Sequence, residues 1–411
     1  MDRIICNADL HLHGIYSGAT SKNMVPRTIA EQAPLKGLDL VGTADILNPK
    51  WIKIIKSELK ESKDAVGLLE YDNGTKFILQ TEVEDNKRVH HIIFFPSFSK
   101  VYEVREAFKN KSKDIDTEGR PKIWLSGEEI AEICIEAECL IGPAHAFTPW
   151  TAIFKEYNSI QQCYGSYASK IYFLELGLSA DTNMADRISE LHRLVFLSNS
   201  DGHSPWPNKL GREFNRFLLD EISYDAIVSA LMERKNNKVI LNVGLNPLEG
   251  KYHRTRCIGC LEFFSLDKAK QLRWKCPLCG KSIKKGVADR VKELADLAPG
   301  KHPEFRPEYK YIIPLSEIIA LALNIESTYS KKVNEIWKRY IKKFDNEIKV
   351  LLEIEIKELS KINERIAYCI DLFRKGKIKY IPGGGGVYGK PIIQDQKNDK
   401  KHAQKRVHEF F

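Results

Sequence analysis

The sequence predicts an α/β domain followed by a small zinc-binding module and an α-helical domain. Three patterns support this fold class: apolar runs that alternate with helix-like stretches, two Cys-x2-Cys pairs, and amphipathic periodicity after them. A chain of 411 residues is also too long for one ordinary hydrophobic core. We therefore expect structural units at residues 1–245, 246–286, 287–380, 381–403 and 404–411.

The apolar runs of residues 1–245 have the character of buried strands. They contain β-branched and aromatic residues and end in turn-forming residues: LDLVGTAD, KFILQTEVED, VHHIIFFP, CLIGPAHAF, KIYFLELGLS and RLVFLSNSD. Because helix-like stretches separate the runs, we expect a parallel sheet or barrel. Polar residues at the carboxyl ends of such strands lie where α/β folds build their sites.

Residues that can bind metal ions gather at the ends of these runs. On a strand through NADLHLHG, alternation places Asp9, His11 and His13 on one face. The alternative is an edge strand whose histidines only contact water. Histidines with several carboxylates suit zinc, manganese or iron, and such ions activate water and bind phosphate. The other metal-capable residues are Asp45, Glu82, His90, His91, His145, Asp201 and His203.

The cysteine segment predicts a structural zinc ion. Its spacing, C-x2-C-x15-C-x2-C, closes a tetrahedral site, and so short a segment needs the ion to fold. Residues 251–286 carry ten Lys and Arg against two acids, and this net charge of +8 favours a polyanionic partner such as nucleic acid. Phe263, Phe264 and Trp274 either stack on nucleotides or form the module's own core. The four predicted zinc ligands are Cys257, Cys260, Cys276 and Cys279.

Periodicity and composition predict the remaining segments. After residue 287, apolar residues recur at spacings of three and four, which indicates helices. Four consecutive glycines in YIPGGGGVYGKP indicate a flexible linker, with a phosphate-contacting loop as the alternative. The terminal QKRVHEFF matches the peptide by which replication and repair proteins bind a sliding clamp; docking on this protein itself is the alternative. The matching residues are Gln404, Val407, Phe410 and Phe411.

The composition argues against a membrane-bound or secreted protein. No apolar run approaches the roughly 20 residues of a membrane span, and the first residues lack the features of a signal peptide. Nine cysteines, four of them at zinc-ligand spacing, are typical of a reducing compartment. We therefore expect an intracellular, cytoplasmic protein that associates with DNA and not with a membrane.

The order of the metal-capable motifs over residues 1–245 resembles the polymerase and histidinol phosphatase (PHP) family of metal-dependent phosphoesterases. The resemblance implies a distorted (β/α)7 barrel that holds two or three divalent ions (Zn, Mn, Fe or Mg). Asp45 and Asn48 stand where many members carry His, so the resemblance does not decide whether a third ion is bound. His90 and His91 are adjacent, and only one of them can face the site. The resemblance implies that His11, His13, Glu82 and Asp201 hold one ion, that His90, His145, Asp45 and His203 hold the others, and that Asp201, Glu82 and His145 are catalytic.

The stretches ELGLSADTNMADRIS and SNSDGHSPWPNKLGREF, with the zinc module, resemble one branch of that family, the endonuclease Q family of DNA repair nucleases. The resemblance implies hydrolysis of the phosphodiester 5′ of a deaminated base (uracil, hypoxanthine or xanthine) or an abasic site. A phosphatase for small phosphate esters and a clamp-tethered DNA-binding scaffold are the alternatives. Arg212 would contact a phosphate, or else form a structural ion pair. Glu175 would accept a hydrogen bond from the base, or else only support the metal shell. The other residues expected to contact the substrate are Gly177, Leu178 and Ser179.

Overall fold

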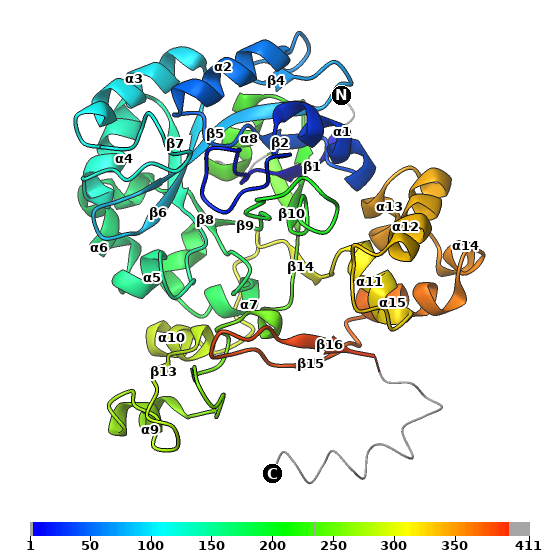
Figure 1. Ribbon diagram of the computed structural model, residues 1–411. Helices are drawn as coiled ribbons and strands as arrows, with labels where there is room; N and C mark the ends of the chain where they lie inside the picture. The colour runs from blue at the N-terminus through cyan, green and yellow to red at the C-terminus, as the bar shows by residue number, and fades with distance from the viewer. Residues whose placement is uncertain (1–2, 233–235, 394–411) are drawn as a thin grey trace, which may run out of the picture.

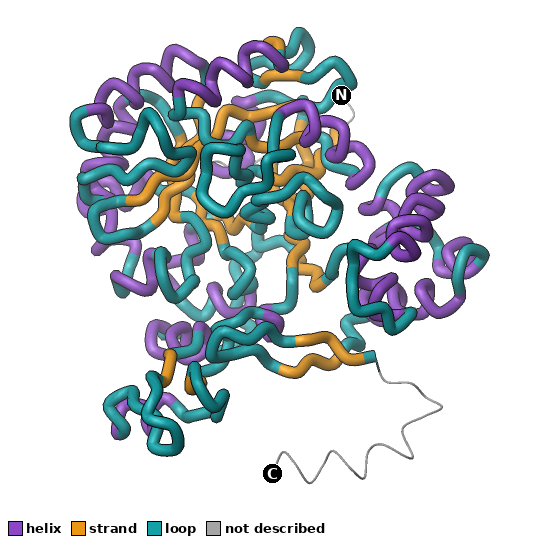
Figure 2. Tube along the Cα trace, viewed as in Figure 1, coloured by secondary structure: helices purple, strands orange, loops and turns teal. Residues whose placement is uncertain are grey.

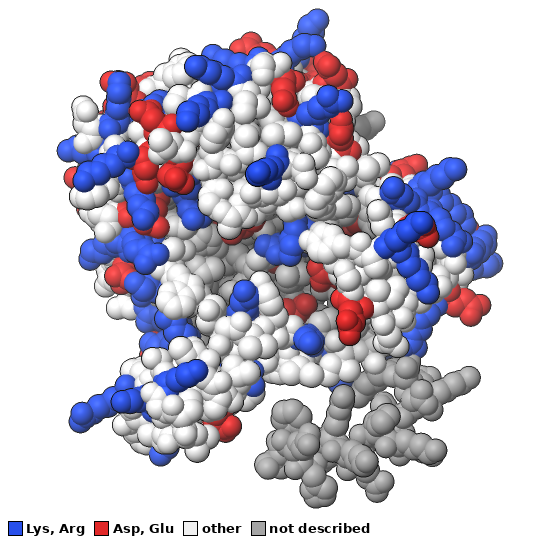
Figure 3. All heavy atoms as spheres, in the orientation of Figure 1, with Lys and Arg blue, Asp and Glu red and all other residues white. Residues whose placement is uncertain are grey.

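The computed structural model describes residues 3–232 and 236–393, which form three parts (Figure 1). The α/β domain contains most of the strands, and a small module with α9 (Leu266–Gln271) lies below it. A group of helices that includes α12 (Lys331–Phe344) forms the third part, and a hollow separates the three on the face shown in Figure 3. The predicted fold class, an α/β domain with a small module and a helical domain, is confirmed.

The α/β domain is built on a mixed sheet (Figure 2). Its strands are β1 (Ile4–Asp9), β2 (Leu40–Gly42), β3 (Lys60–Glu61), β4 (Leu69–Glu70), β5 (Lys76–Glu84), β6 (His90–Phe95), β7 (Leu140–Pro143), β10 (Phe214–Leu219), β11 (Lys238–Gly244) and β14 (Glu308–Tyr311). They pair in the order β14-β11-β10-β1-β2-β5-β4-β3, with β6 beside β5 and β7 beside β6. The strands β1, β2 and β5 are parallel, but β6 runs antiparallel to β5 and β7. The sheet is therefore not purely parallel as predicted, because the tight turn at residues 85–89 makes β5 and β6 a hairpin.

The sheet curls into an incompletely closed barrel. A parallel pair, β8 (Phe173–Glu175) and β9 (Val195–Leu197), follows β7 along the chain. A bridge between Leu12 and Gly202 joins the chain after β9 to the chain after β1. Within the described residues, seven strands follow one another around the barrel: β1, β2, β5, β6, β7, β8 and β9. Because the closing bridge lies beside His11 and His13, closure brings the first and last metal-capable motifs together.

Helices cover the outside of this barrel (Figures 1 and 2). They are α1 (Pro26–Lys36), α2 (Pro49–Glu58), α3 (Phe98–Lys109), α4 (Gly127–Glu136), α5 (Ile153–Glu156), α6 (Ile160–Tyr164), α7 (Thr182–Ala185) and α8 (Tyr224–Met232), with the short 3-10 helices η1 (Gly165–Lys170), η2 (Ser189–Arg193) and η3 (Pro247–Glu249). The helix α2 begins after Asn48, whose side chain accepts hydrogen bonds from the N–H groups of Lys50 and Trp51. Asn48, which the resemblance placed near the third ion, therefore caps a helix here.

The small module has few apolar residues of its own. Its two short strands, β12 (Arg256–Cys257) and β13 (Ile283–Lys284), pair antiparallel, and α9 covers them. The core consists of Ala269, Ile283 and two of the cysteines, with Phe264 and Trp274 packed against it. Phe263 remains 39% exposed and lies under Arg256. Phe264 and Trp274 therefore belong to the module's own core, as one of the two alternatives predicted. Of the three aromatic residues, only Phe263 is left outside this core.

The helices of the third part begin later than the sequence indicated. They are α11 (Leu315–Ala322), α12, α13 (Glu347–Leu352), α14 (Ile356–Ser360) and α15 (Glu364–Arg374). The preceding α10 (Val287–Leu294) instead contacts α7, and β14 pairs with β11 of the barrel domain. Residues 287–313 therefore belong with the barrel and the module, because β14 extends the central sheet.

The glycine-rich segment is a docked hairpin along its described length, not a free linker. The strands β15 (Lys379–Ile381) and β16 (Lys390–Ile392) pair antiparallel. Between them, Gly383 N donates to Leu248 O at 2.8 Å, and Gly383 O accepts from Arg254 N at 3.1 Å. A Cβ atom at Gly383 would lie 2.3 Å from Gly250 O, so only glycine allows this approach. The predicted linker at 381–403 is thus wrong up to residue 393, and the predicted clamp peptide at 404–411 lies outside the described residues.

A buried ion pair joins the barrel to the helical part. Lys36 Nζ, at the end of α1, lies 2.6 Å from Glu347 Oε1, and the side chains are 2% and 0% exposed. Lys36 Nζ also donates to Pro207 O at 2.9 Å, and Trp337 Nε1 donates to Glu347 Oε2 at 2.6 Å. This group of contacts fixes the loop after β9 against the helices.

A Lys36→Met variant is expected to lose about 3–5 kcal/mol of unfolding free energy, because Glu347 would remain buried without its cation. Equilibrium unfolding in denaturant measures this loss. A double variant, Lys36→Met with Glu347→Gln, no longer has the unpaired buried charge. It should therefore recover part of the lost unfolding free energy. A loss below about 1 kcal/mol, the value for an exposed pair, would contradict the buried role.

Candidate active site

Seven of the predicted metal-capable side chains come together at the mouth of the barrel, and we call them the metal-capable cluster. The ligand atoms form three groups, each with all atoms within 4.8 Å of one another. Glu82 is shared by two groups: its Oε1 lies 2.9 Å from both His90 Nδ1 and His145 Nε2. His13 Nε2 lies 3.3 Å from Glu82 Oε2 and 3.1 Å from Asp201 Oδ1. The groups are His11, His13 and Glu82; His13, Asp201 and His203; and Glu82, His90 and His145.

The ends of the barrel strands hold these side chains in place. His11 and His13 follow β1, His145 follows β7, and Asp201 follows β9. His145 has φ 27° and Asp201 has φ 48°, in the left-handed region that residues with a Cβ avoid. Such backbone strain persists only where the surrounding structure imposes it, and it is common at functional sites.

The donor atoms of the cluster suit divalent metal ions. His11 Nε2, His13 Nε2 and Asp201 Oδ1 are buried, and no described residue gives them a hydrogen bond of acceptable geometry. Leaving buried polar atoms unpaired costs free energy, so a bound ligand is expected there. Imidazole nitrogens with bridging carboxylates are donors that zinc, manganese and iron accept. The residues present therefore fit a centre of more than one ion.

The carboxylates of the cluster remain ionised. Burial raises the pKa of Asp201, but His13 and His11 more than offset it and hold the pKa well below its usual range. Burial also raises the pKa of Glu82, and His90 and His11 bring it well below its usual value. For His11, burial lowers the pKa, whereas Glu175 and Glu82 raise it to about 9. Protons on the histidines thus balance the carboxylates, and metal binding would release these protons.

Two predicted ligands, Asp45 and Asp9, do not face the cluster. Asp45 Oδ1 lies 3.1 Å from His13 Nδ1, and its Oδ2 accepts from Gly14 N at 2.7 Å. Asp45 therefore orients the ring of His13, as carboxylates behind metal-ligating histidines do. Asp9 accepts from Ser200 N and from a second backbone amide, and it lies in none of the three groups. The prediction failed for Asp9 because β1 ends there, so strand alternation does not continue to His11.

The structure decides between His90 and His91. His90 points from β6 toward Glu82, whereas His91 points to the opposite face of the strand. His91 Nδ1 lies 2.7 Å from Tyr164 OH, and its Nε2 lies 3.3 Å from Asp85 Oδ2. Both ring nitrogens of His91 are occupied by these neighbours, so the prediction of His91 as a ligand in the barrel site was wrong.

Glu175 is a buried side chain that contacts two members of the cluster. Both of its oxygens lie 3.0 Å from His11 Nδ1. They also accept from His145 N at 2.8 Å and from Asn199 Nδ2 at 2.9 Å. The side chain is 0% exposed, which favours the supporting role, and the contact of Glu175 with a substrate base stays a prediction. Gly177, with φ 70°, packs on His145, while Leu178 and Ser179 are half-buried.

Three residues of the site were missed by the sequence analysis. Arg120 Nη1 lies 3.1 Å from Glu82 Oε2, Glu84 Oε2 lies 3.2 Å from His90 Nε2, and Thr148 Oγ1 lies 3.2 Å from His145 Nδ1. The alternation of TEVED could have found Glu84, which shares a strand face with Glu82. Arg120 lies in a loop with no periodicity, so no sequence signal pointed to it.

A cavity of about 430 Å³ opens beside the cluster and is lined by two cations. Asp201 and His203 form one side of it, and Lys209 and Arg212 face them. Arg212 donates through Nε and Nη2 to Ser200 O, at 3.1 and 2.9 Å. These bonds to a backbone carbonyl hold the guanidinium beside the cavity, where its positive charge suits an anionic group.

The four cysteines of the small module form a second candidate metal site. All four sulfur atoms lie within 4.8 Å of one another. Cys257 Sγ lies 3.4 Å from Cys279 Sγ, and Cys260 Sγ lies 3.5 Å from Cys276 Sγ, and none of the four forms a disulfide. Four thiols at one point, in a module with so small a core, fit a structural zinc ion.

Two solved structures are similar to this chain over nearly its whole length. One is the crystal structure of the lesion-specific endonuclease PfuEndoQ from Pyrococcus furiosus, and the other is endonuclease Q in complex with a 27-mer duplex that has an abasic lesion at the active site. Each has a TM-score of 0.90 and 47% sequence identity, and each match covers 96% of this chain and 98% of the other. The chain belongs to the endonuclease Q family. The resemblance to endonuclease Q that the motifs indicated is confirmed.

Two curated relatives and one family model also match this chain. YqxK of Bacillus subtilis is 30% identical over 406 residues, which cover 93% of this chain and 98% of YqxK. MJ0043 of Methanocaldococcus jannaschii is 51% identical over 260 residues, which cover 62% of this chain but 32% of MJ0043. The family model of the MJ0043 C-terminal domain matches residues 314–377, the helical part. No described helix is long and apolar enough to cross a membrane.

Proposed function

We propose that this protein is a metal-dependent DNA repair endonuclease that hydrolyses the phosphodiester 5′ of a deaminated base (uracil, hypoxanthine or xanthine) or an abasic site. The observation that carries the proposal is the metal-capable cluster, whose buried nitrogen and oxygen atoms include three that form no hydrogen bond with a described residue. The likeness to structures of endonuclease Q over 96% of the chain supports the substrate class. An intracellular, DNA-associated role follows from this activity.

The side chains of the cluster divide into ligands and supports. We assign His11, His13, Glu82, His90, His145, Asp201 and His203 as ligands of two or three divalent ions. Bound there, the ions would activate water and neutralise charge on the phosphate. Asp45 and Glu175 hold the Nδ1 atoms of His13 and His11, which leaves each Nε2 free to bind. Lys209 and Arg212 face the adjoining cavity and would bind the phosphate that is cut.

Recognition of the lesion and of partners completes the proposal. The backbone of residues 177–179 is our candidate for contacts to the extruded base, because Gly177 packs directly on His145. The basic module would bind DNA phosphates, and residues 404–411 would bind a sliding clamp. A phosphatase for small esters has no use for either feature, and an inactive scaffold would not need the intact cluster.

Labelled duplexes, each with one uracil, hypoxanthine, xanthine, abasic site or normal base, test the proposal. We expect cleavage at the 5′ side of each lesion, mapped on a sequencing gel, and none of the normal duplex. Equal cleavage of the normal duplex would contradict lesion specificity. Hydrolysis of a small aryl phosphate without DNA cleavage would favour a phosphatase.

A Glu175→Gln variant is expected to lower the cleavage rate about 10- to 100-fold on uracil and abasic substrates alike, because the ring of His11 loses its ionised partner. Single-turnover rates and metal content, measured on the same preparation, check this. A loss confined to the uracil duplex, with unchanged metal content, would restore a base-reading role for Glu175.

A further inference from the structure

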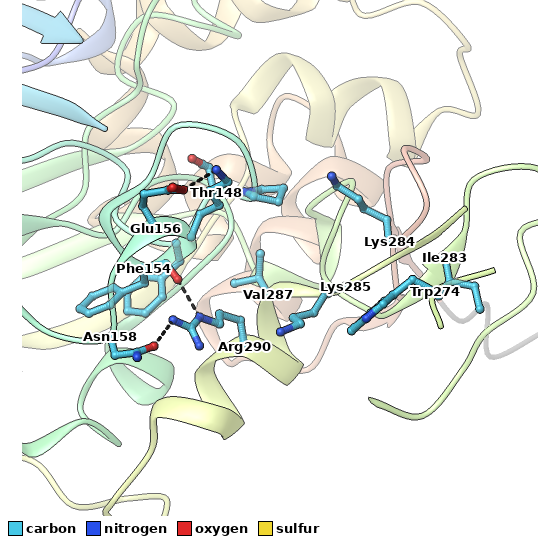
Figure 4. Close-up of a pocket in the computed structure, with 14 residues that line it drawn as sticks. Thr148, Phe154, Glu156, Asn158, Trp274, Ile283, Lys284, Lys285, Val287 and Arg290 are labelled. Carbon is cyan, nitrogen blue, oxygen red and sulfur yellow. Dashed lines mark hydrogen bonds and ion pairs between the residues drawn. The ribbon is translucent and has the colours of Figure 1, made fainter. Parts of the chain in front are cut away.

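Four polar side chains of the barrel domain have buried oxygen atoms without partners, and we call these atoms the oxygen cage. None of them forms a hydrogen bond of acceptable geometry with a described residue. Unlike the groove between the barrel and the small module (Figure 4), the oxygen cage is closed to solvent. Buried polar atoms without partners indicate a bound water or ion. The four atoms are Ser198 Oγ, Glu213 Oε2, Asn242 Oδ1 and Tyr309 OH.

The sheet register brings these side chains to one place. Asn242 of β11 is paired directly with Tyr309 of β14, so their side chains lie side by side on one face of the sheet. A Cβ atom at Gly244 would clash with both Tyr309 OH and Glu213 Oε1, so these two oxygens approach the same point. Burial raises the pKa of Tyr309, the charge of Glu213 adds to the rise, and the Ser198 hydroxyl opposes it. Both side chains are therefore neighbours of the phenol, and the unpartnered atoms form one site.

A chain of three buried amides connects the oxygen cage to the support of the metal-capable cluster. Asn242 Nδ2 donates to Asn215 Oδ1 at 2.9 Å, and Asn215 Nδ2 donates to Asn199 Oδ1 at 2.9 Å. Asn199 Nδ2 donates in turn to Glu175 Oε1 at 2.9 Å, and Glu175 contacts His11. Every amide thus turns its nitrogen toward the carboxylate of Glu175 and its oxygen toward the oxygen cage.

Backbone partners fix the direction of this amide chain. Asn242 Nδ2 also donates to Phe196 O at 3.0 Å, and Asn215 Oδ1 accepts from Ser198 N at 2.8 Å. Neither amide can turn around without losing such a bond. The Oδ1 atom of Asn242 therefore points into the oxygen cage, where only a donor or a cation can satisfy it.

Glu213 contributes a buried carboxylate to the oxygen cage. Its side chain is 0% exposed, and its Oε1 accepts from Leu245 N at 2.8 Å. In the described ranges of the chain, no cation lies within ion-pair distance of it. Burial raises the pKa of Glu213 to about 8, and the Leu245 N–H and Arg212 oppose this rise only in part. A carboxylate in such a place needs a proton or a cation. A proton could be shared with only one of the other three oxygens, whereas a cation could contact all four.

We propose that the oxygen cage binds a monovalent cation, Na⁺ or K⁺, as a structural ion of the barrel domain. All four donors are oxygen atoms, which are the ligands of hard cations. Only Glu213 among them can carry a charge, so one positive charge makes the site neutral. A divalent ion would leave a buried charge without compensation, which is costly. The bound ion would join β11 and β14 to the chain after β9 and would hold the far end of the amide chain.

Thermal unfolding in NaCl, KCl or choline chloride at equal ionic strength tests the proposal. Excess manganese in every solution keeps the alkali ions out of the metal-capable cluster. At about 100 mM salt, Na⁺ or K⁺ should raise the Tm of the wild type by about 2 °C over choline, since an ion that binds only the folded state stabilises it. Glu213→Gln removes the charge but keeps the size of the side chain, and should abolish this rise. Tyr309→Phe, which removes one neutral donor, should reduce it.

The control variant is Glu156→Gln, which removes a carboxylate from the groove shown in Figure 4 and should keep the full rise in Tm. Equal Tm values of the wild type in all three salts would overturn the proposal and leave a protonated Glu213 with buried water. A rise that Glu213→Gln retains would overturn it as well.

Anomalous scattering locates the ion in crystals of the wild type. If K⁺ raises the Tm, crystals soaked in rubidium chloride should show an anomalous peak among the four oxygens of the cage, because Rb⁺ replaces K⁺. If only Na⁺ raises the Tm, this peak should be absent, and an electron-density peak at the same place should have short contacts to the four oxygens. A cage without a peak in both cases would contradict the site. None of these measurements depends on cleavage of DNA.

Discussion

An Asp201→Ala variant is expected to lose at least about 1,000-fold of its cleavage rate, equivalent to about 4 kcal/mol in the activation free energy. Asp201 Oδ1 is buried 3.1 Å from His13 Nε2, and its carboxylate belongs to one of the three ligand groups. Removing it takes away a ligand and leaves His13 with one carboxylate fewer. Single-turnover cleavage of a uracil duplex measures the loss.

The matched control for this prediction is Asp225→Ala, which removes an exposed carboxylate on α8 that belongs to none of the three ligand groups. The control should cut DNA at the wild-type rate. Circular dichroism should be unchanged in both variants, and both should retain the zinc ion of the small module. A folded Asp201→Ala protein that cleaves as fast as the control would show that the cluster is not the catalytic site.

A Cys276→Ser variant is expected to lose one equivalent of zinc and the folded structure of the small module. Zinc binding to four thiolates contributes on the order of 10 kcal/mol to the folding of such modules. The described core of the module is only Ala269, Ile283 and two cysteine side chains, with Phe264, Leu272 and Trp274 packed against it. So small a core cannot replace that energy. Duplex affinity should fall as well, since residues 251–286 carry a net charge of +8 that would contact DNA phosphates.

Cys139→Ser serves as the control, because Cys139 is a buried cysteine of the barrel domain that belongs to no ligand group. Zinc analysis by mass spectrometry reports the first expected loss, and the change in tryptophan fluorescence, to which Trp274 of the module contributes, reports the second. Equal zinc content in Cys276→Ser and Cys139→Ser would contradict the structural zinc site.

The sequence placed the cluster correctly where a strand end determines the position of a side chain. Glu82, His145 and Asp201 follow or end recognisable apolar runs, and the carboxyl ends of these runs meet at the mouth of the barrel. The sequence could not assign Asp45 and Glu175, because a carboxylate that orients a histidine looks the same as one that binds a metal. Only the position of Glu175 between His11 and Asn199 distinguishes the two roles.

The glycine run and the strand directions show a second limit. Four glycines indicate a flexible chain, yet Gly383 is fixed by hydrogen bonds to residues 248 and 254, more than a hundred positions earlier. No local pattern encodes such a contact. The antiparallel direction of β6 was missed for a related reason: the turn at residues 85–89 depends on the Asp85 side chain accepting from Lys87 N and Val89 N.

Metal removal and restoration test the central claim most directly. Protein treated with a chelator until only the module's zinc remains should bind the uracil duplex but not cut it. Stepwise addition of manganese or zinc should restore single-turnover cleavage, with saturation at two or three ions per chain, as the three overlapping ligand groups imply. Cleavage at the untreated rate by protein that retains one zinc would contradict a metal-dependent centre in the barrel.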